Sequence, residues 1–192
     1  MARTESTMLP LGTPAPDFSL PECDDGRMVS LADFAAHDVL LVMFLSNHCP
    51  YVKHLADSLA ALVHHYERAS VGFVAIASND IHDYPDDAPD KMKEEKVARD
   101  YSFPYVFDES QKVAHAYTAA CTPDFFLFDK SRNLVYRGRF DETRPNMGTP
   151  HGADLRAAID AALAGQPPLE PQRPSMGCNI KWKVGNWPPY YG

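Results

Sequence analysis

One cysteine lies where a working thiol would be expected. Cys49 belongs to the segment Ser46-Asn47-His48-Cys49-Pro50, which follows an apolar run and precedes residues at helical spacing. Proline is favoured in the first turn of a helix, where its missing N–H is not needed. If Pro50 is the first helical residue, Cys49 is the N-cap and free backbone N–H groups point at its sulfur. Such positions lower a cysteine pKa from about 8.5 to roughly 3.5–7.5, so the segment predicts a nucleophilic thiolate.

The surroundings of Cys49 leave a second interpretation open. His48 and Lys53 add positive charge close in sequence. If Ser46 caps the helix instead, Cys49 lies buried in the first turn. A buried cysteine that merely fills space is common in protein cores. The position between strand and helix favours a chemical role over that packing role.

A second segment with chemical potential is Cys121-Thr122-Pro123-Asp124, which leads into the apolar residues 125–128. Proline is tolerated at the start of a strand, so strand initiation alone explains Pro123.

Strand and helix patterns alternate around these two segments. The apolar run 39–45 is typical of a central strand buried on both faces. A helix to about residue 68 and a second buried strand at 71–77 follow it. The other expected elements are an N-terminal hairpin (17–21 and 28–31), a solvated helix (91–100), a short strand (105–107), a short helix (111–117), a second hairpin (125–128 and 134–139) and an Ala/Leu-rich helix (153–164). Parallel βαβ units followed by an antiparallel hairpin predict an α/β fold with a central mixed sheet flanked by helices.

We expect a single domain with two irregular ends. Residues 1–16 contain three prolines and are expected to form an extended lead-in without regular structure. Residues 17–165 form the domain, and residues 166–192 form an extended, irregular C-terminal tail packed on it. A chain of 192 residues can bury a sufficient core without disulfides.

Composition excludes several classes of partner. The net charge of -8 argues against nucleic acid and anionic membranes. The longest apolar run, residues 39–45, is too short to span a bilayer, and the polar N-terminus favours a cytoplasmic protein. The four cysteines are far apart, without C-x-x-C or metal-ligand spacing, so we expect free thiols, no metal and no cofactor.

Longer segments carry a resemblance to a known family. Residues 47–53 and the tail residues 174–182 resemble a bacterial group of thioredoxin-like redoxin proteins, related to the AhpC/TSA and peroxiredoxin families; Asn79-Asp80, 84–89 and 103–105 also fit. The resemblance spans roughly residues 8–186. It implies a thioredoxin-like fold in which a cis-proline, here Pro123, packs against the active-site thiol. Because only about 5–6% of X–Pro bonds are cis, a cis bond at Thr122-Pro123 is a specific prediction.

The chain also departs from that group. Its usual pattern is Cys-Asn-His-Cys-Pro, and Ser46 occupies the position of the first cysteine, either naturally or as a replacement. A dithiol reductase needs a second thiol to release a mixed disulfide, so C-x-x-C chemistry is unavailable here. Ser46-x-x-Cys49 resembles the Thr/Ser-x-x-Cys of peroxiredoxins, whose hydroxyl positions a peroxide. Peroxiredoxins carry a proline four residues before that hydroxyl, however, and Val42 stands at this position. They also use an arginine to stabilise the thiolate and the peroxide; Arg137 and Arg139 are candidates for it, but a place on a solvated hairpin explains both better.

Two other cysteines could resolve an oxidised Cys49. Cys121 lies two residues before the expected cis-proline, and Cys178 lies in the tail segment that resembles the family. Either could react with a sulfenic acid or mixed disulfide on Cys49, although a structural thiol is the plainer interpretation of each. Cys23, beside a turn, is expected to have no chemical role.

These observations predict a thiol-dependent oxidoreductase that acts on peroxide or disulfide through Cys49 and draws on a thiol reductant. Such an enzyme would be an antioxidant protein of cell redox homeostasis. Ser46 and His48 would orient substrate or assist proton transfer, and Thr122-Pro123 would shape the site. The alternative is a catalytically degenerate thioredoxin-fold protein that binds a peptide or protein partner; glutathione-linked chemistry is a third option, and a homodimer is left open.

Overall fold

The computed structural model describes residues 3–191 and is built around a five-stranded sheet. In spatial order the strands are β6 (Tyr105–Phe107), β5 (Val71–Ala77), β4 (Val39–Phe44), β8 (Asp124–Phe128) and β9 (Leu134–Gly138). β4 is parallel to β5, and β5 to β6, whereas β8 is antiparallel to both β4 and β9. The predicted mixed α/β sheet is confirmed.

The central strand β4 is buried on both faces, as its continuous apolar sequence predicts. Side chains alternate across a strand, so Leu41 and Met43 join the hydrophobic cluster on one face of the sheet. Val42 and Phe44 join the cluster on the other face. Water is therefore excluded from the strand that leads directly into residues 46–49.

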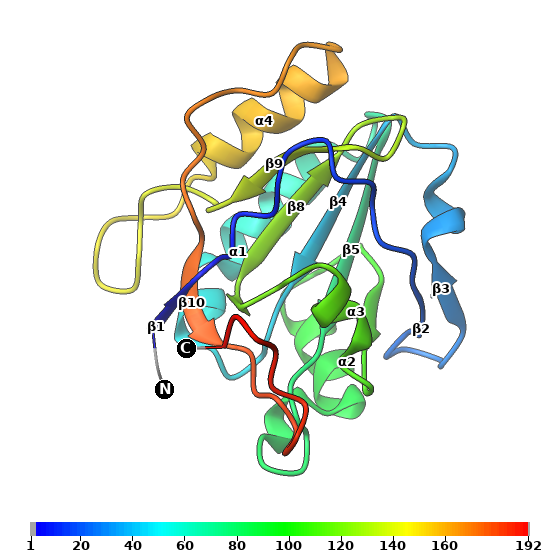
Figure 1. The fold of residues 1–192 in the computed structure, drawn as a ribbon, viewed down its shortest axis with the longest axis vertical. Coiled ribbons are helices and arrows are strands. Elements are labelled where there is room, and N and C mark those ends of the chain that lie inside the picture. The colour runs from blue at the N-terminus through cyan, green and yellow to red at the C-terminus, as the bar shows by residue number, and fades with distance from the viewer. Residues whose placement is uncertain (1–2, 192) are drawn as a thin grey trace.

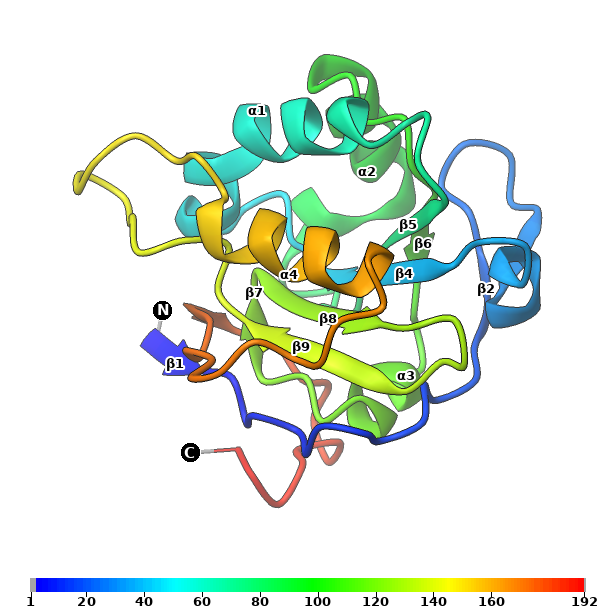
Figure 2. The same cartoon turned by 90° about the horizontal axis from the view of Figure 1, so that it is seen from above.

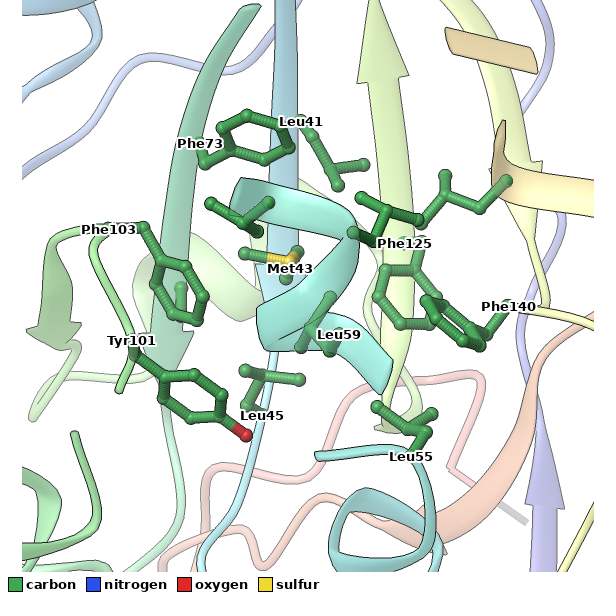
Figure 3. Close-up of a cluster of buried hydrophobic side chains, with 14 of the residues drawn as sticks. Leu41, Met43, Leu45, Leu55, Leu59, Phe73, Tyr101, Phe103, Phe125 and Phe140 are labelled. Carbon is green, nitrogen blue, oxygen red and sulfur yellow. The ribbon is translucent and has the colours of Figure 1, made fainter. Parts of the chain in front are cut away.

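Helices cover both faces of this sheet (Figure 2). Three of them, α1 (Pro50–His65), α2 (Pro89–Ala98) and α4 (Ala153–Leu163), contribute to one cluster, and α3 (Lys112–Ala116) contributes to the other. Figure 3 shows Leu59 of α1 among side chains of the strands, with Met43 and Phe125 nearby. This packing fixes the start of α1 over the end of β4. None of the helices in residues 3–191 is long and apolar enough to cross a membrane.

The N-terminal hairpin is present where the sequence predicts it. Strands β2 (Ser19–Pro21) and β3 (Met28–Ser30) pair antiparallel. Gly26 in the intervening turn has a φ of 75°, a conformation that glycine adopts without strain.

Two expectations about the chain ends are wrong. Residues 1–16 are not without regular structure, because Arg3–Glu5 form β1, and the tail is not wholly irregular, because Met176–Asn179 form β10. Together with β7 (Cys121–Thr122) they make a three-stranded antiparallel sheet in the order β1-β10-β7. Figure 1 shows β1 and β10, from opposite ends of the chain, side by side. Neither strand has a local apolar pattern from which it could be predicted.

Candidate active site

Cys49 is the N-cap of α1, and Pro50 is the first residue of the helix. Its backbone is extended, with φ of −73° and ψ of 120°, and the side chain is completely buried. The first of the two registers considered above is therefore the one adopted. Lys53 lies on the exposed side of the helix, so it does not cover the sulfur.

The segment before β8 packs directly against this sulfur. The Thr122-Pro123 peptide bond is cis, and Cys49 Sγ donates to the carbonyl oxygen of Thr122 at 3.1 Å. Thr122 and Pro123 are both buried. The two segments singled out in the sequence, 71 residues apart at their nearest, thus form one site.

Cys178 reaches the same site from the C-terminal tail. In the β10–β7 ladder Cys178 is the partner of Thr122, whose carbonyl accepts the hydrogen bond from Cys49. The strands approach unusually closely, because a Cβ atom built on Gly177 would lie 1.9 Å from the Thr122 carbonyl oxygen. Both thiols are buried in the same hydrophobic cluster. Strand pairing therefore places a second cysteine beside Cys49.

The two thiols change each other's ionisation. Burial opposes a negative charge on Cys49, but hydrogen bonds from the Cys178 thiol, from Thr122 and from the backbone N–H groups of Val52 and Cys178 outweigh it, so that the pKa of Cys49 falls to about 6. The pKa of Cys178 is raised, first by its hydrogen bond to Cys49 and then by burial. Of the two thiols, Cys49 is therefore the one that ionises more readily, and Cys178 keeps its proton.

The other two cysteines make different contacts, although Cys121 is close enough to Cys49 for a thiolate there to raise its pKa further. Cys121 pairs with Asn179, one position along the ladder, so its side chain points to the opposite face from that of Cys178. Its Sγ lies 3.7 Å from the carbonyl oxygen of Pro123, and burial raises its pKa well above the usual value. Cys23 is half-buried near Asp24 and Lys96, and its pKa is raised to about 11, mainly by burial.

A buried carboxylate organises the loop before Cys49. Asp87 is fully buried and accepts hydrogen bonds from Ser46 Oγ at 3.0 Å, from the Asn47 backbone N–H at 2.6 Å, from His48 Nδ1 at 2.8 Å and from Asn79 Nδ2 at 2.6 Å. Burial opposes its ionisation, but these donors, His48 first, lower the pKa of Asp87 below its ordinary value. The carboxylate therefore stays charged and holds the loop in one conformation.

The tail closes over this network. Asn79 Oδ1 accepts a hydrogen bond from the Lys181 backbone N–H at 2.8 Å. The Lys181 ammonium lies 5.5 Å from the centre of the Tyr84 ring, which in turn stacks on His48 at 5.1 Å. The tail thus contacts both the thiol pair and the carboxylate network.

Neither arginine considered for a peroxide site reaches Cys49. Arg137 Nε donates to the Leu9 carbonyl at 2.8 Å, and Arg139 Nε donates to Asp154 at 2.5 Å. The Ser46 hydroxyl donates to Asp87 rather than pointing into an open pocket. These contacts give the three residues structural roles.

Sequence reasoning missed Asp87 as part of the site. It lies in an acidic, proline-containing stretch that has the composition of a solvated loop. The available signal was indirect: residues 84–89 and Asn79 belong to the segments that resemble the redoxin group. Only the folded chain shows that this one carboxylate is buried.

A cavity and a cluster of possible metal ligands share the loop after β9. A cavity of about 220 Å³ extends from Pro123 and Tyr51 to Met176 and the loop after β9. In that loop Asp141, Glu142 and His151 bring ligand atoms within 4.8 Å of one another. The Asp141 carboxylate already accepts hydrogen bonds from the backbone N–H groups of Thr143, His151 and Gly152, so it serves to close the loop.

The buried thiol at a helix start, facing a cis-proline, defines a thioredoxin-like redox protein. The family model for redoxin matches residues 10–154, so the chain belongs to the redoxin family. The thiol-disulfide oxidoreductase ResA of Geobacillus thermodenitrificans is 28% identical over 130 residues, covering 67% of this chain and 68% of that protein.

Solved structures show the same fold. An uncharacterized conserved protein from Geobacillus kaustophilus is 49% identical with a TM-score of 0.92, and the match covers 95% of this chain and 97% of that one. A hypothetical protein from Sinorhizobium meliloti is 48% identical, also with a TM-score of 0.92, over 95% of this chain and 100% of that one. A thiol:disulfide interchange protein DsbE from Chlorobium tepidum, so described provisionally, is 22% identical, with a TM-score of 0.65, over 81% and 99% of the two chains, and it shows the fold alone. The predicted thioredoxin-like fold is confirmed, and the relatives support a thioredoxin-like redox function.

Proposed function

We propose that this protein is a thiol-disulfide oxidoreductase whose two working cysteines are Cys49 and Cys178. The observation that carries the proposal is the pairing of Cys178 with Thr122, whose carbonyl accepts a hydrogen bond from Cys49. The second thiol, which a C-x-x-C motif would supply from the same loop, is here supplied by the C-terminal tail.

The reaction follows from the ionisation of the pair. The Cys49 thiolate attacks one sulfur of a substrate disulfide, forms a mixed disulfide and releases the other sulfur as a thiolate. Cys178 then loses its proton and attacks Cys49 Sγ, which forms the Cys49–Cys178 disulfide and releases the second substrate thiolate. A dithiol reductant restores the pair by the same exchange in reverse.

The contacts support disulfide over peroxide as the substrate. Peroxide chemistry would need a hydroxyl and a cation beside the thiolate to hold the two oxygens. Ser46 is committed to Asp87, and Arg137 and Arg139 are committed elsewhere. The named relative that acts on thiols and disulfides, ResA, supports the same choice.

The burial of Cys49 defines how substrate must approach. Because both thiols are buried, a substrate sulfur reaches Cys49 only after a local movement, and the movement we propose is that of β10 away from β7. The cavity beside Pro123 and Met176 is the adjoining space into which a substrate chain can extend.

Trapping and mapping of disulfides test the proposal. The reduced protein, in a Cys23→Ser background, is mixed with 2-hydroxyethyl disulfide and quenched with acid, and its peptides are mapped by mass spectrometry. We expect a Cys49–Cys178 disulfide in the parent protein and in the Cys121→Ser control. Cys178→Ser should instead accumulate a mixed disulfide on Cys49.

Four outcomes would overturn the proposal. A Cys49–Cys121 disulfide would show that Cys121, on the opposite face of β7, resolves the mixed disulfide in place of Cys178. Complete turnover of insulin disulfides by Cys178→Ser would make the tail cysteine dispensable. A parent protein that reacts with hydrogen peroxide but leaves the disulfide intact would favour a peroxidase, and one that reacts with neither would favour the peptide-binding module.

A further inference from the structure

Asp87 fixes the orientation and the tautomer of His48. The two groups are 2.8 Å apart, between a carboxylate oxygen and Nδ1. Because an ionised carboxylate only accepts hydrogen bonds, Nδ1 must carry the hydrogen. In the neutral imidazole the lone pair therefore lies on Nε2.

His48 Nε2 is a buried nitrogen that no other group in residues 3–191 hydrogen-bonds. The His48 side chain is 12% exposed, and its ring is stacked on Tyr84 at an interplanar angle of 17°. A buried polar atom without a hydrogen-bond partner reduces the stability of the fold. A role in the reaction would explain why such an atom is kept here. A ring nitrogen without a hydrogen-bond partner is free to exchange a proton with a group that approaches it.

The thiol pair next to His48 has a proton to move. His48 directly precedes Cys49 in the loop, bonds to Asp87 of the short 3-10 helix 85–87 and stacks on Tyr84. Lys181 of the tail lies over the Tyr84 ring and is close enough to Cys178, Cys49 and Asp87 to interact with their charges. Cys178 must lose its proton before it can attack the mixed disulfide, and the leaving substrate thiolate must gain one. The same step therefore releases one proton and takes up one proton.

We propose that His48 Nε2 carries this proton from Cys178 to the departing substrate thiol, and that Asp87 is the positioning residue that keeps Nε2 available. Cys178 passes its proton to neutral His48, and the Cys178 thiolate attacks Cys49 Sγ. The Cys49–Cys178 bond forms as the bond from Cys49 to the substrate sulfur breaks. Imidazolium then protonates the leaving thiolate and returns to the neutral form. The inference rests on the proposed disulfide chemistry.

The choice of leaving group tests this role. An aliphatic thiol is a basic leaving group that needs a proton, whereas an aromatic thiol such as 5-thio-2-nitrobenzoate leaves readily as the anion. Single-turnover conversion of the mixed disulfide to the Cys49–Cys178 disulfide is followed by rapid mixing and acid quench across a range of pH. We expect His48→Gln to slow release of 2-mercaptoethanol about a hundredfold, within the usual range for general acid–base catalysis, and to slow the aromatic thiol much less.

Further variants separate this role from a structural one. Asp87→Asn should alter the pH profile as His48→Gln does, whereas His64→Gln, near the other end of α1 and paired with Glu67 and Asp100, should leave it unchanged. Equal slowing of both leaving groups by His48→Gln, or a pH profile identical to that of the parent protein, would overturn the inference. If Cys178→Ser still blocks resolution in that case, the proposed function stands without the proton carrier. If Cys178→Ser resolves at the parent rate, the proposed function itself fails.

Discussion

Gly177 is the residue on which the contact between the two thiols depends. A Cβ atom at this position would lie 1.9 Å from the Thr122 carbonyl oxygen, 2.6 Å from its carbonyl carbon and 3.2 Å from Pro123 N. All three are backbone atoms of a buried segment, so no side chain can rotate away. Since real Cβ contacts essentially never fall below 3.0 Å, Gly177→Ala must move β10 away from β7 by at least 1.1 Å.

Such a displacement affects hydrogen bonding and the position of Cys178 as well as packing. Adding 1.1 Å to an ordinary N–H···O distance of about 2.9 Å removes the hydrogen bond, and forced overpacking costs about 1–3 kcal/mol. Cys178 moves away from Cys49 together with the strand. Without the hydrogen bonds from Cys178, burial dominates the ionisation of Cys49 and its pKa rises from about 6.

The assay is the pH dependence of Cys49 alkylation by iodoacetamide, read from peptide masses. An acid whose pKa is lowered is ionised above that value, so the parent rate should rise with a midpoint near pH 6. In Gly177→Ala the midpoint should move to higher pH, and formation of the Cys49–Cys178 disulfide should slow. Gly185→Ala is the control in the same tail. Gly185 has a φ of 83°, so alanine there adds backbone strain of roughly 1–2 kcal/mol, but the new Cβ meets no other atom and does not approach the thiols. A folded Gly177→Ala protein with the parent midpoint and the parent rate of disulfide formation would refute the reasoning.

Two further predictions concern charge and core packing. Lys181→Gln should raise the midpoint of Cys49 alkylation by up to about one pH unit, because it removes a buried positive charge that attracts both thiolates. The control is Lys183→Gln, at a half-exposed residue near Glu109, which should leave the midpoint unchanged. An unchanged midpoint in Lys181→Gln would contradict the electrostatic argument. Leu59→Ala should reduce the free energy of unfolding by about 2–5 kcal/mol, measured by urea denaturation, because Leu59 is completely buried. Val97→Ala, 76% exposed on α2, should change it by less than about 0.5 kcal/mol, and a similar small loss for Leu59 would show that the core does not rely on α1 as described.

The sequence determined the elements that carry strong local patterns. The apolar run of β4 and the helical spacing of α1 reflect burial on a fixed period, which a sequence displays directly. The strands at 71–77 and 105–107 have the bounds that their apolar runs predicted. Pro50 offered Cys49 as the N-cap, because the preference for proline in the first turn is local, but Ser46 remained an alternative cap until the structure showed Cys49 in that position.

Tertiary structure alone decided which residues meet at Cys49. Strands β1 and β10 have no local signal, because they exist only through pairing between opposite ends of the chain. The choice of Cys178 over Cys121 depends on the register of that pairing, since one step along a strand turns a side chain to the other face. Burial of Asp87 likewise depends on donors from distant segments, which no acidic stretch reveals by itself. A local sequence pattern therefore predicted the position of Cys49 at the start of α1, whereas long-range contacts decided which residues surround it.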